Sequence, residues 1–294
     1  MIDAALEVAS AGAARGEIVF PDDFHGFPGT VHGGAVAALF HRLTRPWLPV
    51  RLHLELFRGV PTNTPLRLVT GSAGVEARLG LWHGDRHAAQ AALTRALVEP
   101  EPAVLAPSPT VLGPSDGEAP RTRSCLACGT ENPLGLGLGL RWNARWIWQP
   151  YEPRETYRTR SGEIHPALAT IALDELGWWL GALAQKECGV TTEIVVTLWR
   201  SIPSGPLLLV GDRAAVQADG DPRGRYCRAF GGLFTGSGEP VATGEVRFAG
   251  SPAYTRRLLE PFRRTTALSD LARLFPGVTF LAERAGVPPN SAPA

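Results

Sequence analysis

The chain has 294 residues, of which 44% are hydrophobic, and its formal net charge at pH 7 is +1. This length predicts two domains, and the nearly neutral charge without a basic face argues against a nucleic-acid binder. The first 15 residues lack a basic start followed by an apolar run, and no apolar run approaches membrane-spanning length. We therefore expect a soluble cytoplasmic protein with no membrane partner.

The first half of the chain reads as a strand, a helix and four more strands. A short strand is predicted over residues 17–20, and an apolar helix over 33–43 that ends before a proline. The four further strands are predicted over 50–58, 65–71, 74–82 and 87–98, with a turn at 83–87 between the last two. Six prolines between residues 99 and 122 exclude a helix and an interior strand, so this segment is predicted to be a linker.

The second half repeats the first. The segments GTVHGGAVAALFH at 29–41 and GEIHPALATIALD at 162–174 share a Gly-x-x-His at the same offset from an apolar helical run. A strand, an Arg-x-x-Pro corner and another strand follow each helix, at 52–69 and 194–210. The second helix is predicted over 166–186, and the alternating Gly and Leu of 135–140 predict a strand with one bare face.

This repeat, in which one helix packs across antiparallel strands twice, predicts an α+β fold in four segments. The predicted boundaries are 1–99 for the first unit, 100–123 for the proline-rich linker, 124–250 for the second unit and 251–294 for a C-terminal extension. The extension has no counterpart in the first half, and it is predicted to contain a short amphipathic helix over 268–274 and a frayed end.

The cysteine pattern leaves more than one reading open. Cys125-x-x-Cys128 could be half of a zinc site or a redox pair. A structural zinc ion needs four ligands, and the other cysteines, Cys188 and Cys227, do not form a second pair of this kind. The histidines of 83–87 have ligand spacing but fit a turn between strands. The sequence therefore favours free thiols and predicts no metal site.

Two segments resemble a known family. FPGTVHGG at 27–34, followed by an apolar helix, resembles the signature of hotdog-fold acyl-CoA thioesterases of the phenylacetyl-CoA thioesterase type. CLACGTENPLGL at 125–136 looks like the opening of many bacterial members. The resemblance implies a double hotdog, in which two antiparallel sheets, each wrapping a central helix, pack side by side and imitate the family's usual homodimer.

The resemblance also implies a substrate. It would be an acyl-CoA or acyl-carrier-protein thioester, with coenzyme A present only as part of the substrate and no other cofactor. Whether the chain acts as a monomer or pairs again as a homodimer of double hotdogs stays open.

The two copies of the repeat complement each other chemically. Gly33 lies where a helix begins, so its N–H has no partner within the helix and could hold the oxyanion formed from a thioester. Asp174 and its equivalent His41 lie eight residues further along their helices, roughly 12 Å away. In the family each site takes its glycine from one subunit and its carboxylate from the other. We therefore expect Gly33 and Asp174 to form one working site, and Pro166, which has no N–H, to form a degenerate site with His41.

Further residues are assigned around this pair. Asp174 is predicted to act as a general base on water or as a nucleophile that forms a mixed anhydride. His32 completes the catalytic set, although a structural role in fixing its turn is favoured for it and for His165. Glu175 points about 100° away from Asp174 on the helix and is the weaker actor. The predicted substrate-binding residues are Gly34, His25, Arg58, Arg200, His165 and Glu175. The two arginines lie at matching strand ends, where each is expected to meet either coenzyme A phosphates or a surface carboxylate.

The sequence thus predicts hydrolysis of an acyl thioester at one composite site, with two alternatives. The first is an accessory protein that binds acyl thioesters with weak or no catalysis, because one site is degenerate and no clear Asn or Gln holds a water. The second is a hotdog hydratase or dehydratase, which His41 or His25 near Asp174 would favour.

Overall fold

The computed structural model describes residues 1–74, 76–96 and 109–277. The predicted order of strand, helix and four strands is confirmed in the first half, with ends shifted by a few residues, and the helix at the N-terminus was not predicted. The elements are α1 (Ile2–Ala9), β1 (Glu17–Ile18), β2 (His25–Phe27), β3 (Thr30–Val31), α2 (Gly33–Thr44), β4 (Val50–Leu56), β5 (Leu66–Ala73), β6 (Glu76–His83) and β7 (Arg86–Arg95).

The second half repeats this order with a longer central helix, 19 residues against 12. Its elements are α3 (Pro109–Leu112), β8 (Gly117–Glu118), β9 (Arg141–Trp142), β10 (Trp146–Tyr151), α4 (Ala167–Gln185), β11 (Gly189–Leu198), β12 (Leu207–Asp212), β13 (Gln217–Ala218), β14 (Tyr226–Thr235), β15 (Pro240–Gly250), α5 (Pro252–Leu258) and α6 (Leu268–Leu274).

Two predictions in this half are wrong. The linker contains the short helix α3, which starts at Pro109, because the first position of a helix does not need a free N–H. Residues 135–140 are not a strand: Gly137 has a φ of 67°, which interrupts an extended ladder. The predicted frayed end lies outside the described residues.

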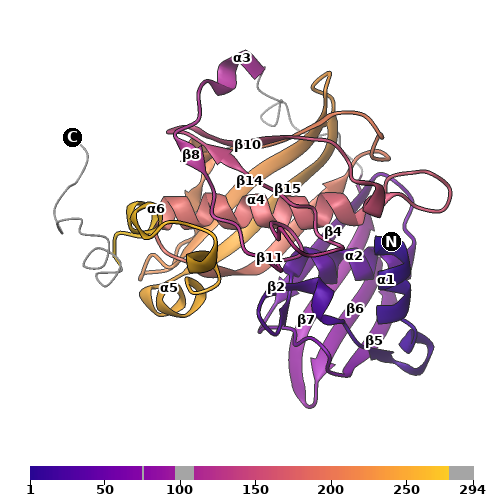
Figure 1. The fold of residues 1–294 in the computed structure, drawn as a ribbon. Coiled ribbons are helices and arrows are strands. Elements are labelled where there is room, and N and C mark those ends of the chain that lie inside the picture. The colour runs from indigo at the N-terminus through magenta and orange to yellow at the C-terminus, as the bar shows by residue number, and fades with distance from the viewer. Residues whose placement is uncertain (75, 97–108, 278–294) are drawn as a thin grey trace.

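One antiparallel sheet of thirteen strands runs through both halves (Figure 1). Its order is β1-β5-β6-β7-β4-β11-β15-β14-β12-β10-β9-β8, and β13 pairs with β14. The halves join where β4 pairs with β11, from Val50 opposite Leu198 to Glu55 opposite Glu193. The two sheets predicted from the sequence are therefore one continuous sheet. The physical reason is that each half alone would leave an edge strand with unpaired backbone groups, and the two edges satisfy each other.

The helices α2 and α4 lie side by side and antiparallel against this sheet. Gly34 of α2 packs against the backbone of Thr170 and Ile171 in α4, so close that a Cβ there would lie 2.5 Å from the Thr170 carbonyl oxygen. By length and composition α4 could cross a membrane, contrary to the sequence analysis, but 94% of its apolar stretch is buried within this chain. It is the core helix of the fold.

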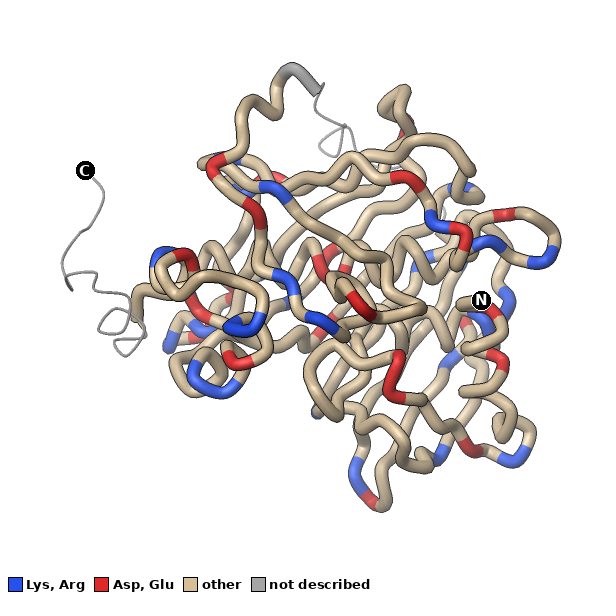
Figure 2. The backbone as a smooth tube through the Cα atoms, viewed as in Figure 1, with Lys and Arg blue, Asp and Glu red and all other residues tan. Residues whose placement is uncertain are grey.

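The two ends of the helix pair are covered by different segments. The helix α1 buries Ile2, Leu6 and Ala9 and lies beside α2, whereas α5 and α6 of the C-terminal extension lie at the far end of α4 (Figure 1). Charges of both signs are scattered along the chain rather than gathered on one side (Figure 2). The cores of the two halves are therefore alike, but different segments cover the two ends of the helix pair.

Candidate functional site

A cavity of about 830 Å³ opens where the two halves meet. Its walls come from segments that are distant in sequence: the start of α2, the middle of α4, the start of β11, the Cys-x-x-Cys turn and the C-terminal extension. The lining residues that carry polar or reactive groups include His32, Gly33, Cys125, Cys128, Asp174, Glu175 and Thr191.

The antiparallel helix pair brings Asp174 to the first turn of α2. Asp174 is 3% exposed, and a Cβ added to Gly33 would lie 2.8 Å from its Oδ2. The N–H of Gly34 donates to Oδ2 at 2.8 Å. Among the described residues none accepts a hydrogen bond from the Gly33 N–H. The site thus leaves one donor, at the positive end of a helix dipole, free for a ligand beside a buried carboxylate.

Asp174 is held by three donors. The Thr191 hydroxyl donates to Oδ1 at 2.8 Å, and the Gly34 N–H and His32 Nδ1, the latter at 3.1 Å, meet Oδ2. Burial raises the pKa of Asp174, and these three partners oppose the rise. Thr191 was missed by the sequence analysis, and it lies 17 positions from Asp174 at the start of the next strand, where no local spacing pointed to it.

His32 lies between two carboxylates. Its Nδ1 faces Asp174, and its Nε2 is 3.5 Å from Glu175 Oε2. Burial alone lowers the pKa of His32, but the Asp174 charge and a hydrogen bond with Glu175 outweigh it and raise the pKa to about 9. His32 is therefore a cation at neutral pH that donates to both carboxylates. Glu175, which the sequence predicts to be the weaker actor and a substrate-binding residue, lines the cavity, and the same imidazole reaches both it and Asp174.

The degenerate pair lies at the other end of the same two helices. Pro166 caps α4 without an N–H. His41 faces that end, and its buried Nε2 has no hydrogen-bond partner among the described residues. The His165 Nδ1 accepts the Ala167 N–H at 3.0 Å. His165 therefore lies outside the cavity, contrary to its predicted role in binding substrate.

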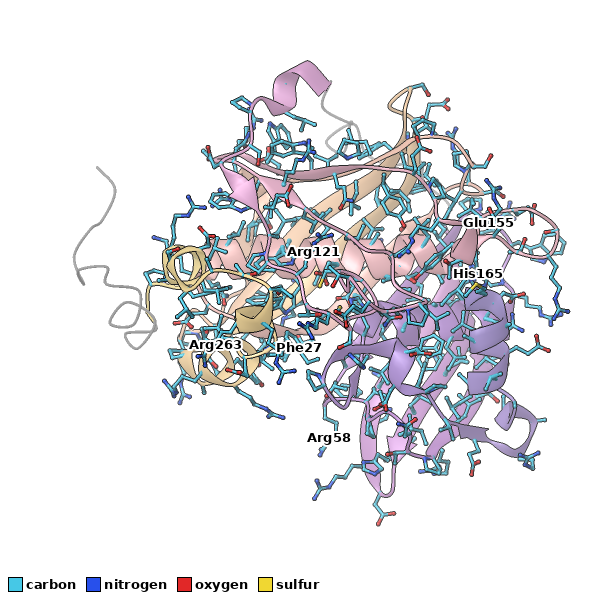
Figure 3. All side chains as sticks on the ribbon, in the orientation of Figure 1. Phe27, Arg58, Arg121, Glu155, His165 and Arg263 are labelled. Carbon is cyan, nitrogen blue, oxygen red and sulfur yellow. The ribbon has the colours of Figure 1, made fainter. Side chains whose placement is uncertain are left out.

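The helix α1 closes this second end. Asp3 of α1 forms an ion pair with Arg42 and lies 3.7 Å from His165 Nε2. Figure 3 shows His165 close to α1, on the side away from Phe27 and Arg263. Burial lowers the pKa values of His41 and His165 to about 4, so both side chains are neutral at neutral pH.

The four remaining predicted substrate-binding residues can also be placed. His25 lies off the cavity and its Nε2 pairs with Ser124 Oγ at 2.8 Å. Arg200 forms a surface ion pair with Glu239 at 3.2 Å, which is the simpler of its two expected roles. Gly34 directs its N–H to Asp174 instead of the cavity. Arg58 does line the cavity mouth, where it is exposed (Figure 3).

The C-terminal extension forms the opposite side of the mouth. Phe262 packs against Phe27 of β2, with ring centroids 6.3 Å apart, and against Trp178 at 6.1 Å. Arg257 and Arg264 line the mouth, and within the described part of the chain neither has a carboxylate partner. The sequence analysis gave this extension no role, because nothing in the first half corresponds to it.

Comparisons with known proteins identify the fold. Neither a family model nor a curated protein matches the sequence. A putative thioesterase from Novosphingobium aromaticivorans is 18% identical with a TM-score of 0.53, and the match covers 80% of this chain and 94% of that one. A protein of unknown function with a hot dog fold from Alicyclobacillus acidocaldarius is 13% identical, with a TM-score of 0.51 and coverages of 80% and 93%.

A dehydratase domain is similar as well. The PpsC dehydratase domain from Mycobacterium tuberculosis, solved in complex with C12:1-CoA, is 19% identical with a TM-score of 0.50, and the match covers 80% of this chain and 92% of that one. Identities of 13% to 19% show the fold and not the reaction. The chain therefore has an α+β hotdog fold.

Proposed function

We propose that this chain hydrolyses an acyl-CoA thioester, with an acyl-carrier-protein thioester as the variant substrate. The reaction takes place at a single composite site, to which the first half contributes Gly33 and the second half Asp174. The observation that carries the proposal is the buried Asp174 carboxylate beside the unpaired Gly33 N–H, at the meeting of the two helices. The two halves act together as two subunits of a hotdog homodimer would.

The chemistry follows from these two groups. The thioester carbonyl oxygen accepts the Gly33 N–H, and a water hydrogen-bonded to Asp174 attacks the carbonyl carbon. Asp174 takes the proton of that water, the oxyanion stays on Gly33, and the C–S bond then breaks with return of the proton to the leaving thiolate. Losing one such oxyanion donor typically costs about 3–4 kcal/mol of transition-state stabilisation.

The walls of the cavity suit an acyl-CoA. The rings of Phe27, Trp178 and Phe262 form an apolar side for the acyl group. Arg257 and Arg264 at the mouth are suited to phosphate groups, because the guanidinium binds phosphate through two parallel hydrogen bonds. The C12:1-CoA bound to the structurally similar PpsC domain supports the same class of ligand here.

The test is thiol release from a panel of acyl-CoAs of different chain length. We expect release for part of the panel by the wild-type protein and loss of release in Asp174→Asn. Tight acyl-CoA binding without thiol release from any member would instead assign the chain as an acyl-thioester-binding accessory protein.

A second candidate is dehydration of a 3-hydroxyacyl thioester or its reverse. It is favoured by the 3.1 Å contact between His32 and Asp174, since hotdog dehydratases pair a histidine with an acidic residue, and by the similarity to the PpsC dehydratase domain. The histidine is not His41 or His25, the two that the sequence analysis named for this reaction. Incubation with 3-hydroxyacyl-CoA and 2-enoyl-CoA decides between the two: gain or loss of water by mass without thiol release supports dehydration.

A further inference from the structure

The Cys-x-x-Cys turn lies against the two acidic residues of α4 and the histidine at the start of α2. The ligand atoms of His32, Cys125 and Glu175 all lie within 4.8 Å of one another, and all three residues are buried. His32 Nε2 and Glu175 Oε2 are 3.5 Å apart. Three segments that are far apart in sequence therefore direct an imidazole, a thiol and a carboxylate at one point.

The turn itself prepares the sulfur atoms. The Gly129 N–H donates to the Cys125 carbonyl at 2.9 Å, and a Cβ at Gly129 would lie 2.1 Å from that oxygen, so only glycine fits. The Ala127 N–H donates to Cys125 Sγ at 3.3 Å. An N–H donor stabilises a thiolate, which is the form of cysteine that binds metal. The turn also places the Cys128 thiol next to that of Cys125, on the wall of the same cavity.

The outer partners orient the imidazole and the carboxylate. The His32 Nδ1 faces Asp174 Oδ2 at 3.1 Å, which leaves Nε2 directed at Glu175 and Cys125. The Trp179 indole N–H donates to Glu175 Oε1 at 3.1 Å and leaves Oε2 to face the same point. A carboxylate on the far nitrogen of a ligating histidine and a hydrogen bond to a ligating carboxylate are the usual outer shell of protein zinc sites.

We propose that Cys125, His32 Nε2 and Glu175 Oε2 bind one zinc ion, and that Cys128, which lies next to Cys125 but outside the 4.8 Å group, moves in as the fourth ligand. The Nε2 proton and the thiol protons leave to solvent when the ion binds. Zinc accepts thiolate, imidazole and carboxylate together in four-coordinate sites with bonds of about 2.0–2.3 Å, which places tetrahedral ligand atoms about 3.3–3.8 Å apart. The His32–Glu175 pair already has this spacing, and the Cys125 turn closes on it with a shift of about 1 Å.

The ion would join the start of α2, the opening of the second unit and the middle of α4. It would also fix His32 as the donor to Asp174 and so hold the proposed catalytic carboxylate in position. This inference goes beyond the proposed function, because hydrolysis by Asp174 and Gly33 does not require a metal ion. Zinc on Nε2 would leave His32 no free nitrogen for dehydration. It also supplies the ligands that the sequence analysis could not find for the Cys-x-x-Cys pair.

The test is metal content and metal uptake of the full chain. Protein purified without chelator is measured by mass spectrometry of the elements, then stripped under reducing conditions and titrated with Zn²⁺ against a colorimetric competitor. We expect about one zinc per chain in the wild type and in the control Cys227→Ser, whose thiol is buried elsewhere, and none in Cys125→Ser or Cys128→Ser. Circular dichroism verifies that the variants are folded.

Cobalt gives a second readout that does not depend on stability. Co²⁺ bound to stripped wild-type protein should show thiolate charge-transfer and tetrahedral visible bands, both absent in Cys125→Ser. The proposed site is wrong if wild-type protein neither carries nor takes up zinc. It is also wrong if either serine variant retains zinc at the wild-type level. A Cys125–Cys128 disulfide that persists under reducing conditions overturns it as well, in favour of a redox pair.

Discussion

Replacement of Asp174 by asparagine is the most direct test of the composite site. The two side chains have the same shape, and the contacts around Asp174 can accommodate the change. An asparagine oxygen can accept the Gly34 N–H that now donates to Oδ2 at 2.8 Å, while its NH₂ turns to the oxygen of Thr191, now 2.8 Å from Oδ1. The fold should therefore survive, but the amide cannot take a proton from water or form an anhydride.

The expected loss follows from that single function. A positioned general base contributes about 10²–10⁴-fold to rate, which corresponds to about 3–5 kcal/mol of transition-state stabilisation. The assay is steady-state thiol release with the best acyl-CoA of the panel, together with acyl-CoA affinity by calorimetry. We expect turnover of Asp174→Asn to fall by about that factor while the dissociation constant changes by less than about 3-fold, because only a group used in the transition state is removed.

The matched control is His41→Ala. His41 occupies the equivalent helix position in the degenerate site, so its removal should leave turnover within about 2-fold. Calorimetry should give one productive ligand per chain. Turnover retained in Asp174→Asn, or abolished in His41→Ala, would refute the site assignment and point to histidine-based chemistry.

Three further predictions concern the surroundings of this site. Thr191→Val removes the hydroxyl that meets Asp174 Oδ1 and should lower kcat/KM about 10-fold, the value of one hydrogen bond of roughly 1–1.5 kcal/mol; an unchanged kcat/KM would exclude the hydroxyl from the mechanism. Gly34→Ala places a Cβ 2.5 Å from the α4 backbone and should lower the free energy of unfolding by about 1–3 kcal/mol in urea denaturation. The control Gly71→Ala, whose Cβ meets no atom within 4 Å, should not lower it. Equal stability of the two variants would contradict the close helix contact. Burial lowers the pKa values of His41 and His165 from 6.5 to about 4, so the unfolded chain binds protons before the folded chain does as pH falls. The free energy of unfolding should therefore decrease between pH 6.5 and 4 by up to about 3 kcal/mol per histidine. In urea denaturation at a series of pH values, His41→Gln should make this decrease smaller.

Local patterns in the sequence determined the elements. The nearly continuous apolar runs after Gly33 and Pro166 have the length of buried helices, and the segments around them have the alternation of strands. These signals depend on neighbours a few positions apart, so they located α2, α4, β1, β4–β7 and parts of β11 and β12. The repeat then determined which residues are equivalent, and this was enough to pair Gly33 with Asp174.

Contacts between distant segments were decided only by the tertiary structure. The pairing of β4 with β11, which makes one sheet of two, depends on backbone groups that every strand carries, and no side-chain pattern specifies that partner. The coverage of one end by α1 and the other by the C-terminal extension has no signal in the repeat, because these segments occur once. They explain why the cavity opens at only one end of the helix pair among the described residues.

The site shows the same division. The sequence determined the two groups that define it, Gly33 and Asp174, because they lie at fixed offsets within the repeat. The structure alone decided that Thr191 holds the carboxylate, that Glu175 reaches His32 and that Cys125 lies beside both. The physical reason is that hydrogen bonds and ligand sets depend on distances of about 3 Å between atoms, and the residues that carry them can lie more than 100 positions apart in the sequence. Periodicity records only which face of its own helix or strand a residue occupies.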